Sequence, residues 1–190
     1  LLQNIQIDVS DFDLEGANFS LEANNISLKD KYSLDVKSMS TYYEMYDDHM
    51  TIDKLKFETA ESTFDGDVLF EYNSMEDFQD FVNQVHITAE IRESDLQSKE
   101  IQIFSGEQFP DFKRFSLTGN AEGTVNQLQA EDLDLNVGAS THLTGNLALR
   151  NTTNPDSIFI NAQNIKLNTQ PEDVQFLYGL FSDSALPLDV

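Results

Sequence analysis

The residues of this chain that could do chemistry are its many carboxylates and three histidines. Asp11, Asp13, Glu15, Gly16 and Glu22 fall at the spacing of an EF-hand calcium loop. However, the flanking residues alternate with the period of a strand, whereas an EF-hand needs a helix on each side. We therefore interpret this segment as a solvated acidic strand edge.

The histidines do not form a recognisable metal site. His49, His86 and His142 lie far apart in sequence, and none has a partner at the spacing of two ligands on one helix. The chain has no cysteine, which excludes disulfides, thiolate metal sites and a cysteine nucleophile. No P-loop, G-x-G-x-x-G or G-x-S-x-G motif occurs. We therefore predict a protein that is not an enzyme and that holds no metal or cofactor.

Most of the chain has the alternating pattern that is typical of β-strands. Ile5, Ile7 and Val9 alternate with polar residues, and similar series continue to residue 167. Turn residues separate the series at intervals that predict an antiparallel meander of about a dozen strands. The alternation shifts by one residue between Ala162 and Ile165, which predicts a bulge near 163–164.

Three segments have helical spacing instead. Ser74 precedes a run with Phe78, Phe81 and Val85 on one face, and a second amphipathic run spans 171–181. A weaker candidate is 95–104, for which Ser94 could be the cap. We expect these helices to lie on a sheet, because no stretch of the sequence is apolar enough to cross a membrane.

One strand template occurs twice, at 51–72 and 129–150. Leu55, Phe57 and Thr59 precede a Ser-Thr pair and then Gly66, and the second copy repeats this order with one extra residue before Gly145. We expect that residue to form a bulge near 143–144. The chain is interpreted as one curled segment, 1–190, with related halves at 51–110 and 129–181. Because it begins within a strand pattern and without Met, we interpret it as part of a longer protein.

Such a sheet must cover its apolar face, and the predicted helices are too short to do so. It could fold as a sandwich, close as a barrel, or curl into a groove that holds something apolar. Gly66, Gly119, Gly123 and Gly145 lie in register with the apolar series, which favours strong curvature. The expected fold is therefore mainly β, a long antiparallel meander curled into a groove, with two or three short amphipathic helices.

Charge restricts the partners. The 190 residues include 34 acidic and 11 basic ones, for a net charge of −23. This composition argues against nucleic acid, which binds to positive surfaces. It also argues against electrostatic docking on anionic lipid headgroups.

The template, together with the segments STFDGDVLFEY, MEDFQDFVNQVHITAEIRESDL and FSLTGNAEGTVNQLQAEDLDL, resembles the repeats of the AsmA/TamB superfamily, most closely the TamB-type translocation and assembly proteins of Bacteroidota-like Gram-negative bacteria. The resemblance covers about residues 50–180. It implies a β-taco that crosses the periplasm as part of an inner-membrane-anchored protein. It further implies a role in lipid transport or outer-membrane biogenesis, and an Omp85-type barrel partner bound by parts outside this chain.

A lipid groove of this kind would take phospholipid acyl chains against its apolar residues. The candidates are Leu55, Phe57, Val68, Phe70, Leu117, Leu133, Leu135, Leu147, Leu149, Ile158, Ile160, Ile165 and Leu167. The same residues would equally form the core of an ordinary sandwich. The alternative interpretation is therefore an extracellular or surface β-sandwich that binds a protein or a glycan.

Overall fold

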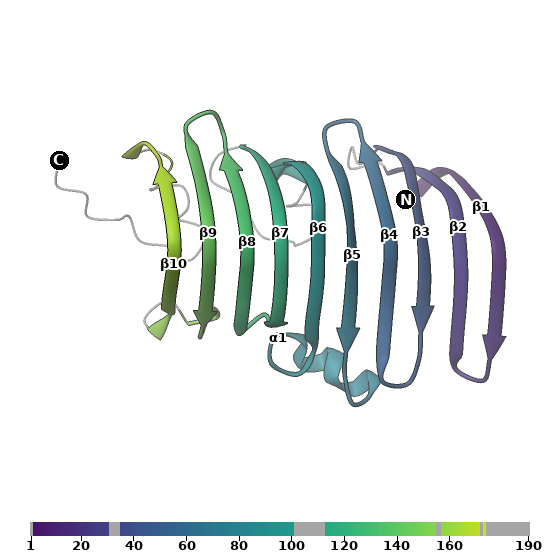
Figure 1. The fold of residues 1–190 in the computed structure, drawn as a ribbon. Helices are drawn as coiled ribbons and strands as arrows, with labels where there is room; N and C mark the ends of the chain where they lie inside the picture. The colour runs from purple at the N-terminus through teal and green to yellow at the C-terminus, as the bar shows by residue number, and fades with distance from the viewer. Residues whose placement is uncertain (1, 31–34, 101–112, 155–156, 172, 174–190) are drawn as a thin grey trace.

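The computed structural model describes residues 2–30, 35–100, 113–154, 157–171 and 173. Ten antiparallel strands form one sheet, in which each strand pairs with the next along the chain (Figure 1). The strands are β1 (Leu2–Glu15), β2 (Asn18–Asp30), β3 (Asp35–Met45), β4 (His49–Thr59), β5 (Thr63–Glu71), β6 (His86–Gln97), β7 (Arg114–Thr124), β8 (Gln127–Val137), β9 (Thr141–Arg150) and β10 (Phe159–Asn168).

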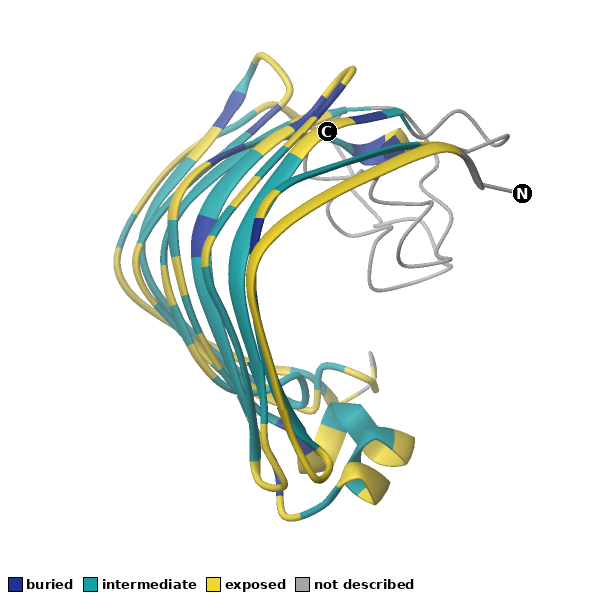
Figure 2. Cartoon of the chain, turned by 90° about the vertical axis from the view of Figure 1, so that its right-hand side faces the viewer, coloured by how far each residue is buried: buried dark blue, intermediate teal, exposed yellow. Residues whose placement is uncertain are grey.

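The sheet is open, and the order of its strands is that of a simple meander. This confirms the predicted fold class, with ten strands in the described part of the chain. The described residues form no second sheet, so they do not make a sandwich. Viewed from the β1 edge, the sheet curls strongly and has a concave and a convex side (Figure 2).

Two short helices connect β5 to β6. The 3-10 helix η1 (Met75–Asp80) leads directly into α1 (Phe81–Gln84). Ser74 caps η1 as predicted, since its side chain accepts a hydrogen bond from the Glu76 amide. Phe78 and Phe81 pack their rings against Tyr72 and Phe70, at ring-centre distances of 4.9 and 5.9 Å. Figure 2 places these helices on the concave side, so the face with Phe70 is the concave one.

The helix predicted at 95–104 is wrong for its first three residues. Residues 95–97 belong to β6, and only 98–100 are helical among the described residues of that range. Ser94 does not cap a helix. Its hydroxyl bonds both the amide and the carbonyl of Leu117, which fastens β6 to β7. Of the segment 171–181, Pro171 and Asp173 are described and are helical, and the rest lies outside the described residues.

In four strands a bulge contains a residue with positive φ. These residues are Asn4, Lys54, Asp132 and Asn164, and their φ angles are 53°, 51°, 51° and 55°. At each one two residues oppose a single residue of the neighbouring strand. The predicted bulge at 163–164 is confirmed. A bulge bends its strand, so a series of them explains the strong curl.

The two template copies build their bulges in the same way. Leu55 pairs with Gly66, and Leu133 pairs with Gly145, directly after the bulged residue in each case. The amide of Lys54 donates to the side chain of Asp67 at 2.5 Å. The amide of Asp132 donates to the side chain of Asn146 at 3.0 Å. The residue that follows each glycine therefore satisfies the amide freed by the bulge.

The prediction of a bulge near 143–144 is wrong. The pairing of β9 with both neighbours is regular there. The extra residue of the second copy lies in the turn instead. Thr59 and Ser62 are joined by two residues, whereas Val137 and Thr141 are joined by three, beginning with Gly138 at φ +59°. A turn absorbs an insertion easily, while an insertion within the strand would transfer side chains to the wrong face.

Candidate functional site

The concave side of the sheet carries continuous rows of apolar side chains, and we call this side the groove face. One row, the middle row, runs through directly paired residues of all ten strands. Its members are Phe12, Leu21, Tyr43, Ile52, Val68, Ala89, Ala121, Ala130, Leu147 and Ala162. Because paired residues of neighbouring strands share a face, this row is a single apolar stripe across the sheet.

A second complete row lies beside the first, toward the end of the sheet that carries η1 and α1. Its members are Leu14, Phe19, Met45, Met50, Phe70, Ile87, Gly123, Leu128, Leu149 and Ile160. Gly123 is its one gap. A side chain there would come within 2.0 Å of the carbonyl oxygen of Gln127, so the backbone geometry requires glycine.

Beyond the bulges the apolar surface continues toward the opposite end of the sheet. Phe57 pairs with Phe64 and Met39, and Leu135 pairs with Leu117 and Leu143. The bulges keep these residues on the groove face although they are out of step with the middle row. Ile165 follows such a bulge, and its side chain packs over Gly145.

The thirteen predicted residues have a consistent placement. Twelve of them lie in the strands and on the groove face, and Ile158 directly precedes β10. None is buried. Eleven are half-buried, while Ile160 and Leu167 are 57% and 53% exposed. An apolar surface of this extent that is not covered by the described residues can bind an apolar ligand.

The buried side chains lie mostly at the two ends of the groove. Tyr72 and Val85 are buried beside the helices, and Val36 and Val137 are buried at the opposite end. The two ends are therefore packed, and the described residues leave the surface between them open.

Sequence reasoning missed the small residues of the middle row. Ala89, Ala121 and Ala130 are paired neighbours on β6, β7 and β8, and their small side chains make the groove deeper there. Alanine gives only a weak strand signal, so the pattern along one strand does not reveal them. The register between strands is what brings them together.

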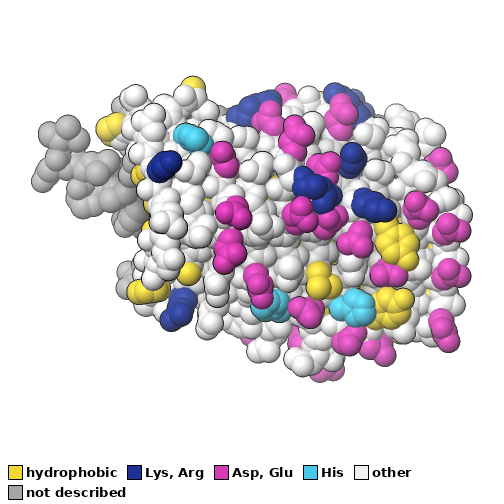
Figure 3. Space-filling model, in the orientation of Figure 1, with side chains coloured by type: hydrophobic (Ala, Val, Ile, Leu, Met, Phe, Trp, Pro, Cys, Tyr) yellow, Lys and Arg dark blue, Asp and Glu magenta, His cyan; other side chains and the backbone are white. Residues whose placement is uncertain are grey.

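The convex side, which we call the outer face, is polar and mostly acidic. Figure 3 shows Asp and Glu side chains mainly over its centre and right-hand part, with smaller groups of Lys, Arg and His and a few apolar side chains. At its centre Arg92 donates to Asp65 at 2.9 Å and to Asp67. The hydrogen bond from Arg92 lowers the pKa of the Asp67 carboxyl below its usual value. Burial raises the pKa of nearby Asp53, with a further contribution from the charge of Asp67.

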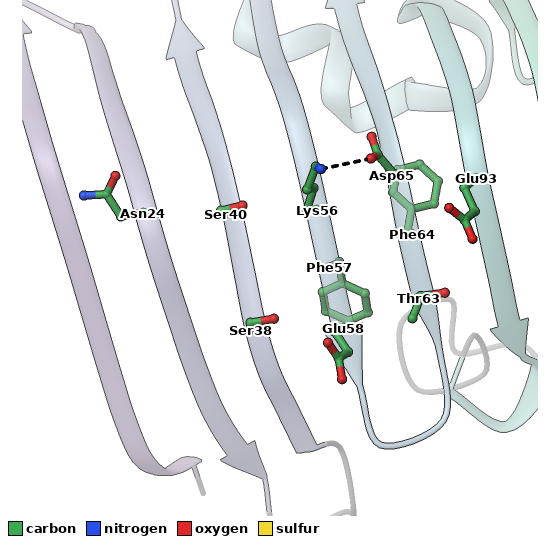
Figure 4. Close-up of a pocket in the computed structure, with 10 residues that line it drawn as sticks. All are labelled: Asn24, Ser38, Ser40, Lys56, Phe57, Glu58, Thr63, Phe64, Asp65 and Glu93. Carbon is green, nitrogen blue, oxygen red and sulfur yellow. Dashed lines mark ion pairs between the residues drawn. The ribbon is translucent and has the colours of Figure 1, made fainter.

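A shallow hollow of about 490 Å³ lies among these polar residues (Figure 4). Ser38, Ser40, Lys56, Asp65 and Glu93 line much of it. Lys56 and Asp65 form an ion pair at 3.4 Å within it. Among the described residues, neither serine hydroxyl of the hollow is hydrogen-bonded to Lys56, Asp65 or Glu93.

Buried carboxylates fasten both template turns at the end of the sheet opposite the helices. The hydroxyl of Thr59 donates to Glu100 at 2.6 Å. Asp173 accepts from Ser140 at 2.6 Å and from Thr141 at 2.9 Å, and it is ion-paired with Lys113. These hydrogen bonds, chiefly the one from Lys113, lower the pKa of Asp173.

The candidate metal residues do not converge. Asp11 and Asp13 lie in β1, and Gly16 lies in a hairpin turn at φ +66°, so this segment is not an EF-hand. Each histidine contacts one carboxylate, His49 with Asp48, His86 with Glu122 and His142 with Asp134. Within the described ranges, no three acids or histidines are grouped as metal ligands.

Among the described residues, no helix has the length and apolar character needed to span a membrane. No protein-family model, curated protein or solved structure gives a significant match to the chain. The fold and the groove face therefore define only a structural class, an open and strongly curled antiparallel sheet whose apolar concave side is not covered by the described residues.

Proposed function

We propose that this chain is a periplasmic segment of a bridge-like lipid transport protein and holds lipid acyl chains against its groove face. The observation that carries the proposal is the continuity of the groove face. Two apolar rows cross all ten strands without a charged residue. A ligand with a long hydrocarbon chain matches a surface of this shape better than a compact ligand does.

The energetics also support acyl chains. Covering apolar surface contributes about 25 cal/mol per Å², and the contribution needs no specific polar partner. The groove face supplies such surface at nearly equal spacing along its whole length, so no single position is strongly favoured. A chain can therefore move along the rows without losing much contact.

The outer face fits passage through an aqueous compartment. Its charges keep that side hydrated, and a net charge of −23 opposes self-association. In this proposal the membrane anchor and the Omp85-type partner belong to other parts of a longer protein of the AsmA/TamB kind.

The alternative proposal is a surface binding module for a protein or a glycan. Its sandwich form requires a second sheet, whereas the described residues form a single sheet. A protein ligand would need to cover the groove face with an apolar surface of its own.

Lipid retention and uptake test the proposal. Native mass spectrometry of the purified chain should detect bound phospholipid, and the delipidated chain should take up a lipid with a fluorescent acyl chain. A lipid-free mass together with no uptake would overturn the proposal.

Substitutions on the groove face localise the binding. Leu135→Asp and Phe70→Asp should each reduce uptake at least about tenfold, because a charge in an apolar site must be desolvated. Ala148→Asp is the matched control, since Ala148 lies on the outer face between Leu147 and Leu149 and pairs with Gln129 and Asn161. The isosteric change Val68→Thr provides a milder variant, and circular dichroism checks that each variant folds. Normal uptake by all three groove variants would exclude the groove face as the site.

A further inference from the structure

The two ends of the groove differ in charge. We call the end formed by the connections after β1, β3, β5, β7 and β9 the helical rim, because η1 and α1 lie there (Figure 1). These connections contain no Lys or Arg. Their described acidic residues are Asp47, Asp48, Glu76, Asp77 and Asp80. The opposite rim is mixed, with Lys113 paired to Asp173 and Arg114 paired to Asp95.

The helical rim joins its acids directly to the apolar surface. Phe78 and Phe81 pack toward Tyr72 and Phe70, at the end of the groove face. Glu76 and Asp80, on the same two helices, are exposed. A lipid whose tail lies on Phe70 would therefore hold its headgroup close to carboxylates.

No basic group on the same helices offsets this charge. The last turn of η1 and that of α1 contain no basic residue. Asp77 accepts a hydrogen bond from the neutral Asn73, and Asp80 accepts one from the neutral Asn83. Asp48 contacts the His49 ring, and Arg150, at the end of β9, lies over the ring of Phe159.

Resting on the proposed function, we infer that the groove discriminates by headgroup charge and takes zwitterionic phospholipids in preference to anionic ones. A headgroup with a net negative charge is repelled by the carboxylates of the helical rim. A zwitterionic headgroup has no net charge to repel, and its ammonium is attracted to the same carboxylates. Such interactions between exposed charges weaken with salt, because screening shortens their range from about 30 Å at 0.01 M to about 8 Å at 0.15 M.

The experiment compares two lipids that share their acyl chains. The delipidated chain is incubated with vesicles that carry fluorescent-tailed phosphatidylethanolamine or phosphatidylglycerol in a phosphatidylcholine background, at 10 mM and at 300 mM salt. Uptake of the zwitterionic lipid should exceed that of the anionic lipid at least about fivefold at low salt, and the ratio should approach one at high salt. Equal uptake at low salt, or better uptake of the anionic lipid, would overturn the inference and leave lipid binding standing. No uptake of either lipid would overturn the proposed function and the inference with it.

A pair of charge-reversal variants tests whether the rim, and not the total charge, selects the lipid. Asp47→Lys/Glu76→Lys changes two exposed acids of the helical rim, and it should raise uptake of the anionic lipid while that of the zwitterionic lipid changes less than twofold. Glu93→Lys/Glu131→Lys makes the same change in net charge with two exposed acids of the outer strand surface. This control variant should have the same ratio of zwitterionic to anionic lipid uptake as the unmodified chain. An equal shift in both variants would overturn the assignment to the helical rim.

Discussion

Two glycines show how far single residues determine the shape of the groove. Gly123 and Gly145 have φ of +127° and +134°, a backbone conformation that other residues rarely adopt. At Gly145 an added Cβ would lie 2.8 Å from the carbonyl oxygen of Asn164 in the bulge of β10. Glycine there lets the backbone of a bulged strand come close to its neighbour.

Gly145→Ala should lower the free energy of unfolding by about 3 kcal/mol, because backbone strain and a close backbone contact act together. Gly16→Ala is the control. Gly16 also has a positive φ, +66°, but no atom lies within 4 Å of an added Cβ. The control should therefore lose only about 1 kcal/mol. Urea unfolding measures both, and equal losses would show that the contact with β10 has no effect.

The buried carboxylate of Asp173 should make stability depend on pH. Its pKa is lowered in the folded chain, so the ionised form stabilises the fold above the ordinary value of about 3.9, and this contribution is lost as the pH falls through the folded pKa. Asp173→Asn should cost about 2 kcal/mol at pH 7, since it breaks a buried ion pair with Lys113. Urea unfolding at several pH values checks this. A difference between the two proteins that stays constant down to pH 2 would contradict the assignment.

At the scale of elements, the turns and the strands respond differently to added residues. The two template copies differ in length only within their hairpin connections, and their bulge and glycine pairs remain in register. The strands are constrained because a shift by one residue moves every following side chain to the other face.

One inserted residue therefore tests this distinction. A glycine inserted after Ala60 converts the first turn to the length of the second, and it should cost less than about 1 kcal/mol. A glycine inserted between Leu143 and Thr144 should unfold the β8–β10 part, because it shifts the β9 residues that follow it, including Leu147 and Leu149, to the other face of the sheet. Circular dichroism and urea unfolding distinguish the two, and comparable losses would show that the turn is as constrained as the strand.

The sequence predicts the faces of the strands, because alternation is a local property. It also predicts the bulge at 163–164, where the alternation itself shifts, and the cap at Ser74. It does not predict the positive φ of Lys54 and Asp132, since neither residue type signals that conformation as glycine does. The cluster of Asp173 with Lys113, Ser140 and Thr141 joins residues that are distant in sequence, so only the folded chain reveals it.

At the scale of the whole molecule, the net charge opposes the tendency of the edge strands of the described sheet to pair with other chains. β1 is an edge strand of this sheet. Its side chains Ile7, Phe12 and Leu14 are 60%, 61% and 64% exposed. An edge of this kind pairs readily with another chain. The net charge of −23 opposes such pairing at neutral pH.

Self-association should therefore appear as this charge is neutralised. Near pH 4.1, the isoelectric point given by the sequence, the carboxylates take up protons and the repulsion between chains disappears. Light scattering should detect monomers at pH 7.5 and growing oligomers at pH 4.1. Salt at 0.5 M and pH 7.5 should have a weaker effect in the same direction. A chain that stays monomeric at pH 4.1 would show that the edges are protected by something other than charge.

The number of strands has a consequence for how many ligands the groove accommodates. Ten strands have nine spacings, and at about 4.8 Å each they make the middle row about 43 Å long. One leaflet of a bilayer has a hydrocarbon depth of about 15 Å, half of the roughly 30 Å core. A lipid tail laid along the row would therefore occupy about a third of it. If the groove carries lipid, its full occupancy is two or three molecules arranged in file, and its capacity increases with each strand added at either edge.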